Sequence, residues 1–210
     1  MTGFTRQGPL AISAFSAALV FLGCASSTAS AALVFSSLPG LEGNGSFTGS
    51  MIFTATGATT GTCSVSLTNT SPAANGGFLT AFAFNVVDGV TLGFNSSTQP
   101  TWGLLSVVDA NPYRIFDYGA GIGSWLDGGP PFNGMAVGIT SVTEFSVSAT
   151  AGVLATLTDS SFFDDSNGYA FAARFRGFAN GGSDKVLGVV PAPGAIALLA
   201  LAGLASRRRR

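Results

Sequence analysis

The chain has 210 residues, only 9% of them charged, and no histidine, which excludes Ser-His-Asp and Cys-His catalysis and any zinc site with imidazole ligands. Five of the nine basic residues lie at the two ends, so the body keeps four basic residues against ten acidic ones, a net charge of −6. Such a body lacks the positive surface that nucleic acid requires.

Glycine and phenylalanine are abundant, with 29 and 18 residues, and Ser and Thr are frequent. This composition is typical of an all-β protein with many turns, whose exposed strand faces carry neutral hydroxyl groups. A helical protein of this size needs more Glu, Lys, Arg and Gln on its exposed faces. We therefore expect an all-β body between two terminal segments of different character.

The first 31 residues contain the three parts of a secretory signal peptide. Arg6 supplies a positive charge, the segment 10–22 is apolar, and Ala29 and Ala31 are the small residues of a cleavage site. We expect an N-terminal signal helix, residues 1–31, that is cleaved after Ala31, and therefore an exported protein.

The two cysteines allow a second interpretation of the N-terminus. The stretch "FLGC", which ends at Cys24, resembles a bacterial lipobox, so lipoprotein processing is the alternative to cleavage after Ala31. In neither case do we expect an intramolecular disulfide, because cleavage after Ala31 leaves only Cys63 and an acylated Cys24 cannot pair with it. Cys63 falls on the apolar side of a predicted strand, where a small buried residue is expected rather than a nucleophile.

The body shows the period-two pattern of half-buried strands. In "GTCSVSLTNTS", Cys63, Val65 and Leu67 alternate with hydroxyl residues, and "TEFSVSAT" and "GYAFAARFRGF" alternate in the same way. Turn sequences such as Asn75-Gly76 and Asp88-Gly89 separate the strands. Further strands are expected at 50–56, 78–87, 90–94, 102–108 and 153–158, with the irregular stretch 118–134 as a long loop or edge insertion.

Many short strands joined by turns predict an antiparallel β-sandwich of the jelly-roll or immunoglobulin-like kind over residues 32–178. A closed barrel is the alternative. The Gly- and Ser-containing segment 179–188 is expected to be a linker.

Two groups of side chains are candidates for binding. Asp159, Asp164 and Asp165 could supply oxygen ligands to Ca²⁺, although solvated acids at a turn explain the same residues. Trp102 and Trp125 could stack on sugars, or they could complete the core. We expect no other cofactor.

The acidic residues also bear on catalysis. A glycosidase needs two opposed carboxyl groups, and nothing in the spacing assigns Glu144 a partner among Asp109, Asp117 and Asp127. We therefore expect no enzyme activity.

The C-terminal segment 189–210 combines three features. Pro191 and Pro193 precede the apolar segment 194–206, and the chain closes on Arg207, Arg208, Arg209 and Arg210. Thirteen residues give a helix of about 20 Å, short of the roughly 30 Å of a bilayer core. The segment is apolar all round, unlike the last helix of a soluble fold. The arginines would hold its end on the cytoplasmic side of a membrane.

These features resemble the PEP-CTERM sorting signal of exported bacterial proteins. Ala192 stands where that signal usually has glutamate. The resemblance implies an exosortase-type processing enzyme as a partner, transient insertion of the C-terminal hydrophobic helix into the inner membrane, and association with exopolysaccharide at the cell surface. We therefore expect an exported structural or adhesive protein of the cell envelope or extracellular matrix, with a non-catalytic carbohydrate-binding module as the alternative.

Overall fold

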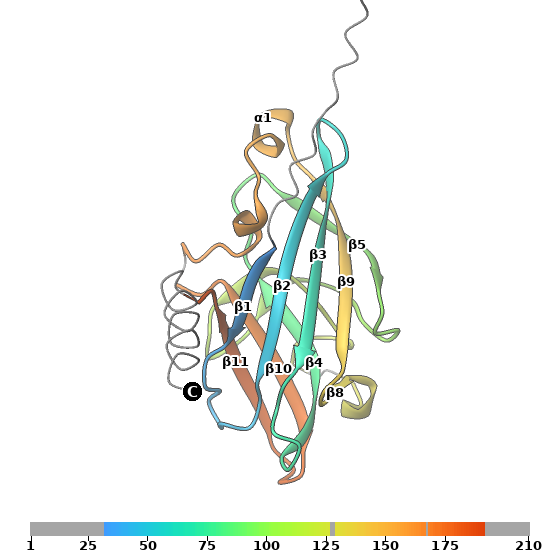
Figure 1. Cartoon of the computed structure of the whole chain (residues 1–210), viewed down its shortest axis with the longest axis vertical. Helices are drawn as coiled ribbons and strands as arrows, with labels where there is room; N and C mark the ends of the chain where they lie inside the picture. The colour runs from blue at the N-terminus through green and yellow to red at the C-terminus, as the bar shows by residue number, and fades with distance from the viewer. Residues whose placement is uncertain (1–31, 127–128, 167, 192–210) are drawn as a thin grey trace, which may run out of the picture.

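The computed structural model describes residues 32–126, 129–166 and 168–191 (Figure 1). The predicted signal peptide, and the predicted sorting signal from residue 192 onward, lie outside these residues. The strands are β1 (Leu33–Ser37), β2 (Phe47–Ala55), β3 (Thr60–Asn69), β4 (Gly76–Phe84), β5 (Thr91–Ser97), β6 (Gly103–Asp109), β7 (Ile115–Gly121), β8 (Met135–Ala136), β9 (Thr140–Ser148), β10 (Phe171–Phe178) and β11 (Ser183–Val189). Three short helical turns are η1 (Pro131–Asn133), α1 (Ala151–Leu154) and η2 (Asp159–Phe162).

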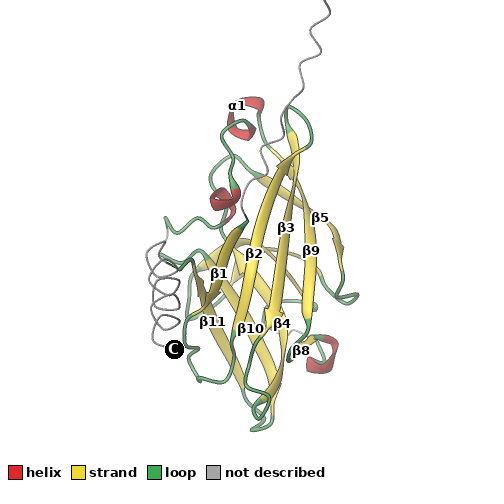
Figure 2. Ribbon diagram, viewed as in Figure 1, coloured by secondary structure: helices red, strands yellow, loops and turns green. Residues whose placement is uncertain are grey.

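The strands form two layers of antiparallel sheet. Hydrogen bonding runs in the order β5-β9-β3-β2-β1-β11-β10-β4-β7-β6, and β8 pairs with β4. Only two residue pairs join β1 to β11, and at this point the sheet folds back on itself. The front layer is formed by β1, β2, β3, β9 and β5, and β10, β11 and β4 lie behind it (Figures 1 and 2). The predicted all-β antiparallel sandwich is confirmed.

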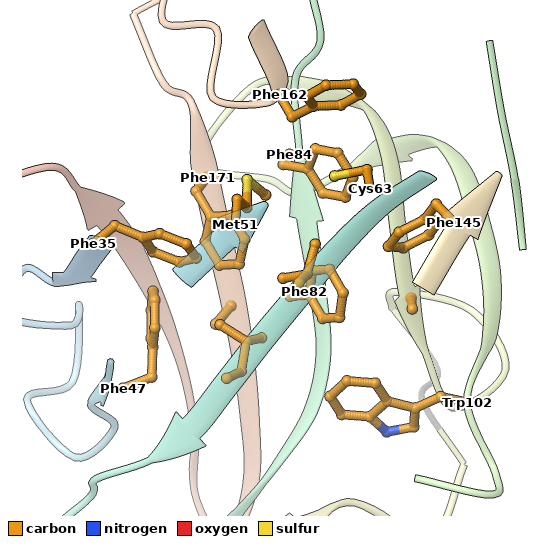
Figure 3. Packing of buried hydrophobic residues seen from close by; sticks show 14 of the residues in the cluster. Phe35, Phe47, Met51, Cys63, Phe82, Phe84, Trp102, Phe145, Phe162 and Phe171 are labelled. Carbon is orange, nitrogen blue, oxygen red and sulfur yellow. The ribbon is translucent and has the colours of Figure 1, made fainter. Parts of the chain in front are cut away.

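The period-two pattern of β3 places its apolar residues between the layers. Cys63, Val65 and Leu67 are buried, and the hydroxyl residues between them are partly exposed. Phenylalanine fills most of the space that these residues face (Figure 3). The Phe82 ring on β4 lies at the centre of this packing, with its centroid 5.7 Å from that of Phe171 and 6.2 Å from that of Phe145.

The rear layer is covered on its outer face as well. The β4 residues that point away from the main core, Ala81 and Ala83, contact a second, smaller apolar cluster that includes Phe116 and Trp125. On these strands the residues are small because larger side chains would not fit. A Cβ on Gly119 of β7 would overlap the carbonyl oxygen of Phe82 on the neighbouring strand. The small residues of β4 and β7 therefore allow two loops to lie against this face.

Basic side chains of β10 and β11 hold those loops in place. The Arg174 guanidinium donates a hydrogen bond to the carbonyl of Leu126, and that of Arg176 donates to the carbonyl of Gly129 at 2.8 Å. The Lys185 ammonium donates to the carbonyl of Asn111 in the loop between β6 and β7. Burial, together with the neighbouring Arg174, lowers the pKa of Lys185.

The structure corrects the strand predicted at 153–158. This segment forms the helical turn α1 and an irregular continuation that leads into η2. Leu154 is buried in the main core, and Leu157, three residues later, packs against it. That spacing brings both side chains to one side of a helical turn, whereas the sequence pattern of Val153, Ala155 and Leu157 resembles strand alternation.

The structure also corrects the predicted linker at 179–188 and the domain end at 178. Only 179–182 form a turn, and β11 then runs back antiparallel to β10, from Ser183 opposite Arg176 to Gly188 opposite Phe171. Val186 is fully buried, so β11 belongs to the core. The folded body therefore extends to Val189 at least.

A buried carboxylate anchors this strand to a distant loop. Asp184 is 2% exposed, and its two oxygens accept backbone N–H groups of Glu42 at 3.0 Å and of Asn44 and Gly45 at 2.9 Å. The backbone N–H of Lys185 also donates to it, at 2.9 Å. The carboxylate thus satisfies donors of the loop between β1 and β2 that would otherwise lack partners.

One strand residue has a strained backbone. Val107 of β6 has a φ of +50° and its side chain is 74% exposed. A β-branched residue in this region costs on the order of 1–3 kcal/mol. Since glycine adopts it freely, we expect Val107→Gly to raise the free energy of unfolding by about 1 kcal/mol, measured by urea denaturation.

The control for this prediction is Val107→Ala, which keeps a Cβ and therefore most of the strain. We expect it to change the free energy of unfolding by less than half as much. A loss of about 0.5–1 kcal/mol in the glycine variant, as for an ordinary strand position, would show that Val107 is not strained in solution.

Candidate functional site

The outer face of the front layer carries rows of Ser and Thr side chains, which we call the hydroxyl face. It is formed by the outward-pointing residues of β2, β3 and β9, which lie side by side across the front of the molecule (Figure 1). Their neighbours along each strand point inward and are mostly buried. The hydroxyl residues of this face are Thr48, Ser50, Thr54, Thr60, Thr62, Ser64, Ser66, Thr68, Thr140, Ser146 and Ser148.

The strand register aligns these residues in rows across the sheet. Thr68 lies opposite Thr48 on one side and Thr140 on the other. Two residues along β3, Ser66 lies opposite Ser50 and Val142, and the row of Thr54, Thr62 and Ser146 follows farther along. Residues opposite one another lie about 4.5–5.5 Å apart, and rows on the same face repeat every two residues, about 6.8 Å. The hydroxyl groups therefore form a regular array.

The hydroxyl face is nearly neutral. Glu144 is the one charged residue at the outward positions of these three strands, and it accepts a hydrogen bond from Asn95 of β5 at 3.2 Å. Ile52 and Val142, 42% and 40% exposed, add small apolar surfaces between the hydroxyl groups. The face can donate and accept hydrogen bonds and can contact C–H groups, but it offers little to a strongly charged partner.

Trp102 and Trp125, the candidates for stacking on sugars, do not form an exposed aromatic surface. Trp102 and Trp125 are only 5% and 4% exposed. Trp102 packs in the main core, with its ring centroid 5.5 Å from that of Phe82, and Trp125 belongs to the smaller cluster behind the rear layer (Figure 3 shows Trp102). Neither ring offers an open face for a sugar, so the alternative interpretation, that they complete the core, is the correct one.

The structure does not bring together the three aspartates that were candidate calcium ligands. Asp159 is buried, and its Oδ1 accepts the backbone N–H of Phe53 at 2.6 Å. Asp164 accepts the backbone N–H and the hydroxyl of Ser166, at 3.3 Å and 2.6 Å, within a local turn that also contains Asp165. Over residues 32–126, 129–166 and 168–191, no three acidic or cysteine side chains gather as a metal site would require.

Cys63 is buried, as predicted for a small core residue. Burial, and secondarily the negative charge of Asp159, raise the pKa of its thiol well above the ordinary value. A protonated, inaccessible thiol is a poor nucleophile.

The carboxylates considered for glycoside hydrolysis lie in different layers. Glu144 is on β9 in the front layer, whereas Asp109 and Asp117 are on β6 and β7 in the rear layer. The Asp117 carboxylate accepts the backbone N–H of Val86 at 3.0 Å, a structural role. Asp127 lies outside the described residues.

The sorting-signal residues are only partly within the described structure. Pro191 is its last residue, directly after Val190, whereas Ala29, Ala31, Pro193 and the four arginines 207–210 lie outside it. Within the residues that the structure describes, no helix has the length and apolar character needed to cross a membrane.

Sequence reasoning identified the Ser/Thr alternation of individual strands but not the array that they form. The strands that build the array are far apart in sequence, since Ser66 of β3 pairs with Val142 of β9. Register across such a separation has no local sequence signal beyond the alternation itself. The rows of hydroxyl groups could therefore be seen only in the fold.

Comparisons with known proteins give little further information. The sequence matches no protein-family model and no curated protein. Among solved structures, the chain is similar to a biomass-sensing module of an RsgI-like protein of Clostridium thermocellum, described as resembling the family 3 carbohydrate-binding module of the cellulosome. The TM-score is 0.30 and the identity 14%, over 60% of this chain and 90% of that module. A TM-score this low is not evidence of a shared function.

Proposed function

We propose that this protein is an exported, non-catalytic component of the bacterial cell surface or extracellular matrix, with a structural or adhesive role, which contacts neutral polysaccharide through the hydroxyl face. The observation that carries the proposal is the in-register array of Ser and Thr side chains on β2, β3 and β9. Export and sorting rest on the sequence of the two ends, 1–31 and 189–210.

Neutral polysaccharide is the partner whose chemistry best matches this face. A sugar chain presents hydroxyl groups that both donate and accept hydrogen bonds, as Ser and Thr do. Between them it presents C–H surfaces that suit Ile52 and Val142. The near absence of charge on the face disfavours nucleic acid and strongly anionic polymers as partners.

The energetics suit a weak, repetitive interaction. A single hydrogen bond contributes only about 0.5–1.5 kcal/mol net. Ser and Thr side chains lose little conformational entropy when they are fixed on a rigid sheet, so little of that gain is lost on binding. An extended polymer that crosses several rows adds these contributions together. The proposed role is therefore adhesion along a chain rather than tight capture of one sugar.

The test is binding of the body to insoluble cellulose, to a soluble neutral β-glucan and to alginate as an anionic polymer. We expect retention on a neutral polymer. Substituting Thr62→Lys and Ser66→Lys at the centre of the face should weaken that retention at least ten-fold, because two long charged side chains cover the array.

The matched control is Ser106→Lys with Ser183→Lys, two exposed hydroxyl residues outside the hydroxyl face. It adds the same charge and should change retention less than two-fold. If the wild-type protein is retained on neither neutral polymer, or if both double variants lose binding equally, the hydroxyl face is not a site for neutral polysaccharide.

A further inference from the structure

An open apolar pocket lies beside the point where the described chain ends. It has a volume of about 400 Å³. Its apolar and aromatic lining residues come from the ends of β1 and β11 and from the segment before β10, and Asp165 is the one charged residue among the described residues that line it. The larger apolar and aromatic residues are Leu38, Phe163, Tyr169, Leu187, Val189 and Val190.

The pocket exposes apolar surface, and burial of that surface would stabilise the protein. Leu38 and Val190 at its rim are 41% and 42% exposed. Phe163 is rigidly placed, since its ring packs against those of Phe35 and Phe171 at centroid distances of 5.1 Å and 6.0 Å. The pocket is therefore a formed hollow with aromatic support, and its volume lies within the range of small-ligand sites, about 300–1,000 Å³.

The chain itself supplies a matching occupant. Val189 and Val190 line the pocket, and only Pro191, Ala192 and Pro193 separate them from the apolar segment 194–206. Three residues reach at most about 10 Å, so this segment starts within reach of the rim. A tether this short gives an effective concentration in the millimolar range, so that even weak affinity fills the pocket.

We propose that this pocket binds side chains of the apolar segment 194–206 of the same chain and shelters them from water before the segment enters a membrane. The segment contains leucine, isoleucine and alanine and no charged residue, which suits a pocket lined by leucine, valine and phenylalanine. Free in water, such a segment would drive aggregation of the exported protein. The inference goes beyond the proposed function, because neither polysaccharide binding nor sorting requires this contact.

The test places a photo-crosslinking amino acid at Leu199 in the chain 32–210, in buffer without detergent. Irradiation should produce crosslinks within one chain to residues that line the pocket, identified by peptide mass. Their yield should not change with protein concentration. Leu38→Lys, which places a charge at the rim, should reduce the yield at least five-fold, and Val190→Lys should act in the same way.

The matched control is Leu104→Lys on β6, because Leu104 is also 41% exposed but does not line this pocket. It should leave the yield unchanged. Far-UV circular dichroism of each variant separates loss of docking from loss of fold, and Val190→Lys serves as the second rim variant if Leu38→Lys does not fold.

Three results would overturn the proposal. Crosslinks between chains that increase with concentration would assign the pocket to a second copy. A lack of crosslinks within one chain in the lipid-free buffer would show that the segment does not dock on the folded body. Crosslinks to surfaces other than the pocket would show that the segment 194–206 does not bind there. None of these results changes retention on polysaccharide, so the two proposals fail independently.

Discussion

Replacing Asp184 with alanine should lower the free energy of unfolding by about 3–5 kcal/mol, the scale seen when a buried group loses its hydrogen-bond partner. The carboxylate accepts three backbone N–H groups from the loop between β1 and β2, and the change leaves all three without their partner. Those at Glu42 and Asn44 are partly buried and can recover some hydration, whereas the one at Gly45 is buried. The loss should appear as a lower urea midpoint with an unchanged slope.

Two further variants separate charge from shape. Asp184→Asn keeps the side-chain volume but replaces one acceptor oxygen with an amide donor, so it should lose roughly half as much stability as alanine. Asp88→Ala removes an exposed carboxylate and should change stability by less than about 0.5 kcal/mol. If Asp184→Ala loses no more than the Asp88 control, the carboxylate does not hold the loop.

Asp184 also shows why the sequence predicted part of the fold and missed the rest. The segment that contains it is rich in Gly, Ser and Asn, as linkers are, and its apolar positions are few. Its burial depends on backbone donors about 140 residues earlier in the chain, a partnership that no local pattern records. By contrast, β3 and β9 were predictable because each alternates buried and exposed residues without interruption.

The candidate site likewise has some features that the sequence predicts and others that depend on contacts between distant segments. The neutral, hydroxylated character of exposed strand faces follows from composition alone, since few charged residues are available to cover them. Which strands lie together depends on pairing between distant segments, as for Ser66 and Val142. The burial of Trp102 and Trp125 depends on contacts with residues from distant segments, in the main core for Trp102 and in the smaller cluster for Trp125. The sequence around a tryptophan in an irregular stretch does not indicate whether its ring will be buried or exposed.

Changing Arg207, Arg208, Arg209 and Arg210 to serine should release uncut protein into the medium. This rests on the proposed sorting role of the C-terminal segment. Moving one arginine to the bilayer centre costs about 2.5–3.5 kcal/mol on insertion scales, so four of them form a firm stop for a segment of only thirteen residues. Without them nothing opposes complete translocation of so short an apolar segment, and the processing enzyme would meet no membrane-held substrate.

Changing Pro191 and Pro193 to alanine should have a different result, and the difference identifies the signal. The arginine stop is intact in this variant, so the chain should still pause in the membrane. Recognition should fail, because the proline pair is the part that resembles the motif read by the processing enzyme. Uncut protein should then accumulate in the membrane fraction.

Both variants are followed in the native host by fractionation and intact mass. If both are cut and distributed like the wild type, the C-terminal segment is not a sorting signal, whereas uncut protein in the medium for the arginine variant and in the membrane for the proline variant would establish that the segment acts in two separable steps.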